Sequence, residues 1–209
     1  MTELWLTVEF IFLFFALPLG FRYKPFPFPP IPALWLLTCF CLYRLLSDPS
    51  FDRTLLWNPK ALGRFWPQIL ITFSCVAVLV AVAVFYFQPQ WLFNYVRQTP
   101  MFWVLVLVFY PVLSVYPQSV VYRAFLFQRY RKLFPHHLAM VVASAIAFAF
   151  VHIIFRNPIA ISFTLIGGIL FAWRYYESKS LLTSSFEHAL YGCWMFTVGL
   201  GEFFYRGIR

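Results

Sequence analysis

The strongest constraint on this chain is a series of long apolar runs that contain few charged side chains. The clearest run covers residues 69–87, and about 20 apolar residues are what a helix needs to cross a bilayer. The composition agrees, because 62% of the residues are hydrophobic and only 11% are charged, against roughly 25% in an ordinary soluble domain. We therefore expect an all-α, polytopic transmembrane helix bundle.

The length of 209 residues leaves room for about seven spans with short connections and for no second soluble domain. A single integral membrane domain over residues 1–209 is therefore expected. Pro111 and Pro117 interrupt one run, where they either kink one helix or separate two. The predicted spans are 4–19, 33–46, 69–87, 101–128, 137–155, 159–173 and 181–204.

The net charge of +9 is distributed between the apolar runs, where Lys and Arg act as topology signals. No nucleic-acid partner is expected, because the basic residues form no face with interleaved aromatics. With the amino terminus inside, that side would carry nine of them: Arg44, Arg53, Lys60, Arg64, Arg129, Arg131, Lys132, Arg174 and Lys179. The other side would carry six: Arg22, Lys24, Arg97, Arg156, Arg206 and Arg209. This bias favours a multi-pass protein with its amino terminus inside, in the cytoplasmic membrane if the source is bacterial.

Ionisable residues within the runs are the candidates for function. Each costs about 2.5 to 3.5 kcal/mol at mid-span by insertion scales, so each needs a partner or a chemical role. Five stand out: Glu9, Arg123, His152, Glu187 and His188. We expect Glu9 to cap a helix or pair with an arginine. His136 and His137 lie at a span entrance, where interfacial water accounts for them.

The polar residues recur at helical spacing. Gln118 with Tyr122, and Ser119 with Arg123, are four residues apart and should share helix faces. Phe148 likewise precedes His152 by one turn. His188, on a third helix, is followed one turn later by Gly192. Two histidines on different helices can converge on a water molecule or a metal.

In order and spacing, these residues resemble the motifs of the CPBP family, the CAAX prenyl protease type 2 and bacteriocin-processing intramembrane endopeptidases. The family carries Glu-Glu-x-x-x-Arg, Phe-x-x-x-His and His-x-x-x-Asn on successive helices. Arg123, Phe148, His152 and His188 match it, within a motif-bearing half of about 100–205. The resemblance implies an endopeptidase that hydrolyses a membrane-associated or lipid-bearing protein, with membrane lipid as a further partner, in a cavity that opens towards the bilayer.

The sequence departs from the family at three positions. Gln118 and Ser119 replace the two glutamates, and Gly192 replaces the asparagine. In the family, the first glutamate acts with a histidine to activate water, while the other histidine and the asparagine stabilise the oxyanion. Glutamine can orient a water molecule but cannot serve as its general base at neutral pH.

Three accounts of the missing carboxylates remain open. The chain is a non-catalytic relative, it carries an inactivating substitution at Ser119, or another group supplies the base. Glu187 adjoins His188, but it lies about 100° around the helix. Without the family carboxylate, Arg123 should contact Glu9, Glu187 or backbone carbonyls.

No cofactor is expected. A catalytic zinc normally takes three protein ligands, whereas only His152 and His188 are available, so metal-free hydrolysis is preferred over a metal bound by this pair. A non-catalytic membrane binding, immunity or assembly protein on the same fold is the main alternative. A small transporter is a third, although no repeat of the kind many transporters show is present. Substrate, prenylation and oligomeric state stay open.

Overall fold

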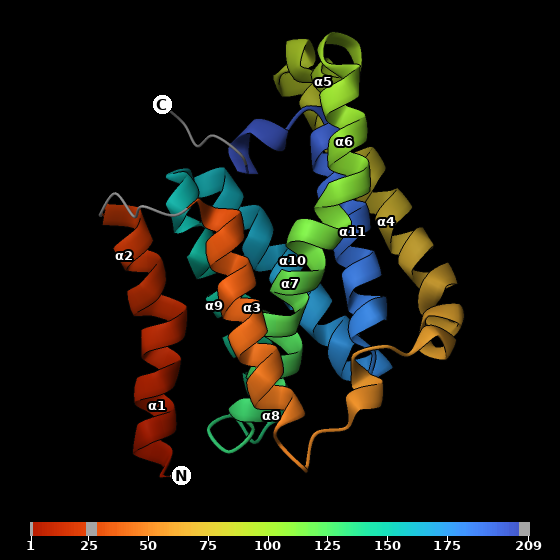
Figure 1. Ribbon diagram of the computed structural model, residues 1–209. Helices are drawn as coiled ribbons and strands as arrows, with labels where there is room; N and C mark the ends of the chain where they lie inside the picture. Colours follow the sequence, from red (N-terminus) through yellow and green to blue (C-terminus); the bar gives the residue numbers. More distant parts are fainter. Residues whose placement is uncertain (1, 24–28, 205–209) are drawn as a thin grey trace.

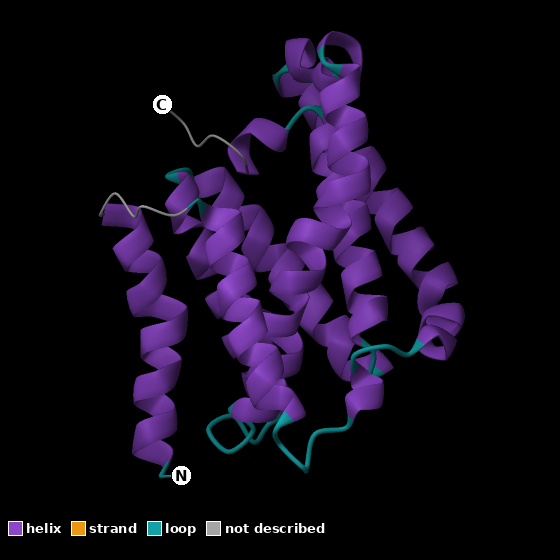
Figure 2. Ribbon diagram, viewed as in Figure 1, coloured by secondary structure: helices purple, strands orange, loops and turns teal. Residues whose placement is uncertain are grey.

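The computed structural model describes residues 2–23 and 29–204, and in these ranges it contains helices and no strands (Figure 1, Figure 2). The predicted all-α class is confirmed. Three charges in the topology count, on Lys24, Arg206 and Arg209, lie outside the described residues. Five helical rods are long and apolar enough to cross a membrane: Glu3–Tyr23, Arg53–Phe87, Pro100–Arg129, His137–Phe155 and Pro158–Ser178. The chain is therefore an integral membrane protein.

Helices occupy all seven predicted spans. In chain order they are α1 (Glu3–Ile11), α2 (Leu17–Tyr23), α3 (Pro30–Leu46), α4 (Pro59–Phe87), α5 (Asn94–Gln98), α6 (Pro100–Tyr110), α7 (Tyr116–Ser119), α8 (Leu126–Arg129), α9 (His137–Val151), α10 (Pro158–Ser178) and α11 (Leu181–Val198). Successive passes run up and down, with the start of α1 at the lower end in Figure 1 and the end of α11 towards the upper end. α3 is shorter than the five rods, and α11 is not among them.

Several helices start where the sequence provides a start signal. Proline begins α3, α4, α6 and α10, where its missing N–H removes no helical hydrogen bond. Asn58 and Asn157 cap α4 and α10 by accepting backbone N–H bonds, as Ser180 does for α11. At the other end, α11 stops at Gly199, whose φ of 106° suits glycine. The predicted span 181–204 is thus too long.

The rod from Pro100 to Arg129 shows whether Pro111 and Pro117 kink one helix or separate two. It is continuous, and α7 lies between two π-helical turns, Pro111–Val115 and Val120–Phe125. Proline removes an intrahelical hydrogen bond and crowds the preceding turn, and wider turns accommodate such disruption. The prolines therefore reshape one helix and do not separate two.

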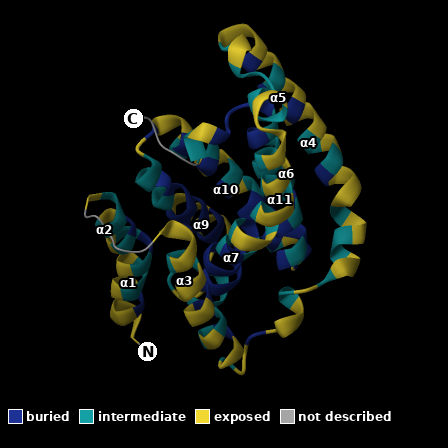
Figure 3. Cartoon of the chain, turned by 45° about the horizontal axis from the view of Figure 1, so that its top comes forward, coloured by how far each residue is buried: buried dark blue, intermediate teal, exposed yellow. Residues whose placement is uncertain are grey.

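The motif-bearing helices form the centre of the bundle. Figure 3 shows buried residues concentrated on α7 and α9, with exposed residues along α1, α3 and α4. α9 and α10 pack closely, because a Cβ at Gly168 would lie 3.0 Å from the Cα of Ala145. Apolar side chains such as Leu79 and Ile166 remain exposed on the outside, as expected where lipid is the solvent.

Candidate functional site

His152 immediately follows α9 as its C-cap and is almost fully buried. Its Nδ1 lies 2.6 Å from the carbonyl oxygen of Phe148. Because a carbonyl can only accept, Nδ1 carries the proton in the neutral ring and Nε2 keeps its lone pair. The hydrogen bond within α9 therefore leaves Nε2 as the proton acceptor of this side chain.

His188 lies in the middle of α11 and is also buried. Its ring stacks on Phe171 of α10, with centroids 4.6 Å apart and an interplanar angle of 19°. Nδ1 is buried and has no hydrogen-bond partner among the described residues. An unpaired buried nitrogen is costly, so this atom is available to a water molecule or a ligand.

The two histidines line one cavity of about 130 Å³, here called the histidine cavity. Phe148 contacts both rings edge-on, at centroid distances of 4.8 Å to His152 and 5.3 Å to His188. Val76 of α4 and Ile166 of α10 also line the cavity; Ile166 is 68% exposed. The cavity therefore reaches the outer surface of the bundle between these helices.

Tyr110 is a cavity residue that the sequence did not single out. It ends α6 and lines the histidine cavity, with its ring 6.4 Å from that of His188. A Cβ at Gly192 would overlap both the ring and the hydroxyl of Tyr110. The phenol thus fills the space beside Gly192, the position at which the resemblance leads us to expect asparagine.

Gln118 and Ser119 are not among the residues that line the histidine cavity. Gln118 donates from Nε2 to the Ser114 hydroxyl at 2.6 Å, and its buried Oε1 has no partner in the described part of the chain. Ser119 is fully buried and donates to the carbonyl of Val115 at 2.9 Å. Both side chains are therefore engaged within their own helix.

Arg123 is fully buried and has no hydrogen-bond partner for any of its three guanidinium nitrogens within residues 2–23 and 29–204. The expectation that it contacts Glu9, Glu187 or backbone carbonyls is wrong. The guanidinium carbon instead lies 4.3 Å from the ring centroid of Phe148 and 5.5 Å from that of Phe171. Cation–π attraction offsets part of its desolvation. The same two rings also contact the histidines.

Glu187 is fully buried but belongs to a different cluster. Its Oε2 accepts from Arg174 Nε at 2.8 Å, and Arg174 also donates to Gln68 of α4 at 3.0 Å. The carboxylate is thus directed to α10 and α4, and it does not line the histidine cavity. The ion pair satisfies both buried charges.

The other predicted polar residues lie apart from the cavity. Glu9 receives two hydrogen bonds of 2.7 Å from Arg129, which is the pairing with an arginine that we expected. His136 and His137 are exposed at the start of α9, and His137 stacks on Tyr176. Among the described residues, no group of three or more His, Cys, Asp or Glu side chains is arranged to hold a metal.

One comparison with known proteins finds a match that covers slightly less than half of the chain. Residues 97–194 match the family described as type II CAAX prenyl endopeptidase Rce1-like. The matched segment contains Arg123, Phe148, His152 and His188, the residues on which the resemblance rests. No curated protein and no solved structure matches the chain. Over residues 97–194, this membrane protein is similar to the Rce1-like type II CAAX prenyl endopeptidases, in agreement with the resemblance that the motifs indicated.

Proposed function

We propose that this protein is a CAAX-type intramembrane endopeptidase that hydrolyses a peptide bond in the histidine cavity. The matched family supports this class of activity. The observation that carries the proposal is the convergence of His152 and His188, from two helices, on one buried cavity that reaches the lipid-facing surface. A lone buried histidine would more often have a packing role, whereas two histidines that line one cavity are suited to polarise water and a carbonyl group.

In the proposed reaction, Nε2 of His152 takes a proton from a water molecule whose oxygen attacks the scissile carbonyl carbon. A ring N–H of His188 and the hydroxyl of Tyr110 donate to the carbonyl oxygen as it becomes negative. His152 then transfers the proton to the amide nitrogen while the carbon–nitrogen bond breaks. Tyr110 would thus take the part that the family gives to asparagine, in the space that Gly192 leaves open.

A resident metal does not fit the residues of this cavity. His152 and His188 supply two ligands, whereas a catalytic zinc normally takes three from the protein. We therefore propose hydrolysis without a metal, in which the histidines bind and activate the water directly.

The substrate is proposed to be a membrane-associated or lipid-bearing protein segment. The histidine cavity has a mainly apolar lining, including Phe163, Leu170 and Met195, which suits a segment delivered from the bilayer. A second apolar cavity of about 390 Å³ lies between α2 and α3. Tyr122 and Val151 form part of its lining, and they precede Arg123 and His152 in the chain. This cavity could hold an apolar chain of the substrate beside the motif helices.

The membrane arrangement is proposed to be multi-pass with the amino terminus inside. The end of the bundle that carries the amino terminus also carries α8 and the connection after α3 (Figure 1). Arg44, Arg53 and Arg129 lie there, in agreement with a basic inner side. For a bacterial source, we propose the cytoplasmic membrane.

A non-catalytic binding, immunity or assembly protein is the second candidate, and one observation favours it. Among the described residues, no carboxylate lines the histidine cavity. Glu187 is held by Arg174 and Glu9 by Arg129, so neither is in place to replace a glutamate at positions 118 and 119. Such a protein would bind the same segment without cutting it. If the protein is instead an active endopeptidase, Gln118 and Ser119 would lower its activity.

The test uses full-length protein in proteoliposomes with a prenylated peptide that ends in a CAAX sequence, followed by mass spectrometry. We expect wild type to cleave the peptide and both His152→Ala and His188→Ala to abolish cleavage while remaining folded. His137→Ala is the matched control, because this exposed histidine stacks on Tyr176 outside the cavity. Full activity in both cavity variants would disprove the proposed site.

A further arm separates the two candidates. If wild type does not cleave the peptide, Ser119→Glu should introduce activity, because it restores a carboxylate at the motif position. A peptide that photo-cross-links to a cavity residue in wild type, and stays uncut in both wild type and Ser119→Glu, would support the binding protein.

A further inference from the structure

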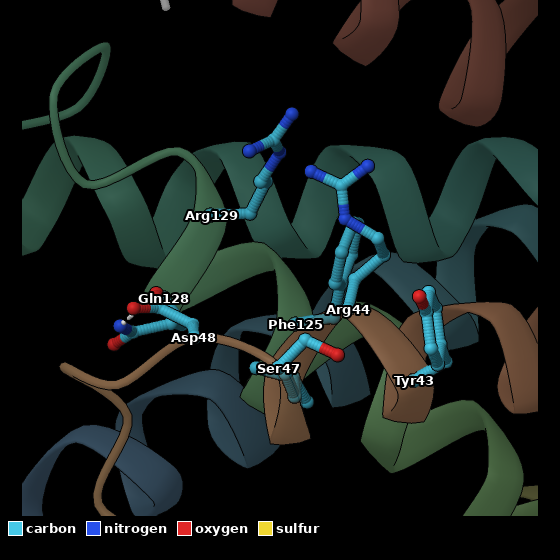
Figure 4. Close-up of a pocket in the computed structure, with 8 residues that line it drawn as sticks. Tyr43, Arg44, Ser47, Asp48, Phe125, Gln128 and Arg129 are labelled. Atoms are coloured by element: carbon cyan, nitrogen blue, oxygen red, sulfur yellow. Dashed lines mark hydrogen bonds between the residues drawn. The ribbon is translucent and has the colours of Figure 1, made fainter.

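A polar pocket of about 510 Å³ lies at the end of the bundle that carries the amino terminus. It shares no residue with the histidine cavity. Its polar lining includes Arg44, Ser47, Asp48, Gln128 and Arg129, from the end of α3, the connection after it and α8 (Figure 4). We infer that this pocket binds the phosphate headgroup of an anionic phospholipid from the surrounding leaflet.

Two guanidinium groups line the pocket. Figure 4 shows the guanidinium groups of Arg44 and Arg129 pointing the same way, while Asp48 and Gln128 are hydrogen-bonded to each other. Arg44 lies half-buried in the last turn of α3 and forms no hydrogen bond or ion pair with the described residues. Two cations that line one pocket repel each other. A bound anion would attract both guanidinium groups and so offset their mutual repulsion.

The carboxylates at this end are already occupied. Glu9 accepts two hydrogen bonds from Arg129 and a third from Tyr130. Asp48 accepts from the Gln128 side chain at 2.8 Å and from the Ser50 backbone and hydroxyl. Arg44 therefore has no hydrogen-bonded carboxylate among the described residues, although the charge of Glu9 lies near enough to interact with it.

The basic character continues at the pocket's edge. An adjoining cavity of about 170 Å³ shares Asp48, Gln128 and Arg129 with the pocket and adds Arg131 and Lys132. Both added side chains are exposed. Four basic residues thus face two engaged carboxylates, an excess of two positive charges that attracts anions to this end.

The surface of α3 explains why the anion would be a lipid headgroup. Leu36 and Phe40 are 67% and 42% exposed, and they precede Arg44 at spacings of four residues. An exposed apolar stripe therefore runs along α3 and ends at the unpaired guanidinium. Acyl chains can lie along this stripe while the phosphate enters the pocket, which is the arrangement of basic headgroup sites between transmembrane helices.

The experiment measures lipid binding to the purified full-length protein by native mass spectrometry, with phosphatidylglycerol and phosphatidylcholine added separately. We expect wild type to prefer phosphatidylglycerol and Arg44→Gln to weaken that binding about fivefold, the effect of removing one cation near a membrane surface. Arg64→Gln is the matched control, because this exposed arginine lies on α4 and lines neither basic cavity. It should retain wild-type binding.

Arg44→Lys guards against a folding defect, since it keeps the charge and most of the aliphatic stem. It should retain most phosphatidylglycerol binding and the wild-type melting temperature. Equal binding of the two lipids by wild type, or equal losses in Arg44→Gln and Arg64→Gln, would overturn the inference. Inorganic phosphate that displaces phosphatidylglycerol at millimolar concentration would also overturn it, because the pocket would then be a site for a soluble anion.

Discussion

Two buried arginines of this bundle differ in their partners, above all in the presence of a carboxylate. Arg174 and Arg123 are both almost completely removed from the surface. Arg174 is paired with Glu187 and hydrogen-bonded to Gln68, whereas Arg123 rests on Phe148 and Phe171 without a hydrogen-bond partner in the described ranges. The carboxylate that Arg123 lacks is the one expected at position 119. Ser119 lies one turn before Arg123, at a motif position where the family carries glutamate.

The largest effect on stability is expected when Arg174 loses its carboxylate and is left, like Arg123, without one. Glu187→Ala removes the carboxylate from a fully buried pair and should lower the free energy of unfolding by about 3 to 5 kcal/mol. Reversible unfolding in SDS measures the change. Glu177→Ala is the matched control: this partially exposed carboxylate lies 3.7 Å from Arg174, and its loss should cost at most about 1 kcal/mol. Equal losses would contradict the comparison.

The reverse change supplies Arg123 with a carboxylate. Ser119→Glu and Ser119→Gln place side chains of the same shape in the same packed position, so the difference between their unfolding free energies isolates the charge. We expect Glu to be the more stable by about 1.5 to 3 kcal/mol, the value of a hydrogen bond to a charged group. In an Arg123→Met background the order should reverse, because the new carboxylate would be buried alone.

A smaller effect is expected from removing Arg123 itself. Arg123→Met takes away a buried charge that has no hydrogen-bond partner, so the free energy of unfolding should change by less than about 1 kcal/mol or rise. Arg174→Met should be strongly destabilising, since it leaves Glu187 alone. Unfolding in SDS compares the two variants, and similar losses would show that Arg123 has a partner of comparable strength.

The smallest effect concerns a carboxylate at the surface, Asp48 in the connection after α3. Hydrogen bonds from Gln128 and Ser50 lower the pKa of Asp48 to about 2. A lowered pKa stabilises the fold above the ordinary pKa of aspartate, near 4, and this contribution is lost as the pH falls through about 2. The melting temperature of wild type should therefore slightly exceed that of Asp48→Asn at pH 5, and the two should converge towards pH 2. A constant difference would assign the effect to packing.

The fold was predictable because its signals are local. Apolar runs such as residues 69–87 identify the spans, and a proline or a capping side chain marks several helix starts. The ends were less certain: α10 continues to Ser178, beyond the predicted end at residue 173. An apolar run predicts which residues lie within the membrane. The residue at which the helix ends depends instead on capping and on contacts with other helices.

The site was predictable only in part. Motif spacing singled out Phe148, His152 and His188 as site residues. Helical periodicity, however, shows only which residues share a face within one helix. The rotation of each helix about its axis is decided by packing, which directs Glu187 to Arg174. Tyr110 could not be found by spacing, because it reaches Gly192 from a different rod.

The ring of Phe148 joins three elements of this site in one contact surface. It carries the guanidinium of Arg123 on its face and touches the imidazoles of His152 and His188, while its backbone carbonyl fixes the His152 tautomer. An aliphatic side chain of similar volume would fill the core but would lack the negative π-face that holds the cation. Loss of the aromatic ring would therefore leave the Arg123 cation without its main contact, next to the two imidazoles that we propose to transfer a proton.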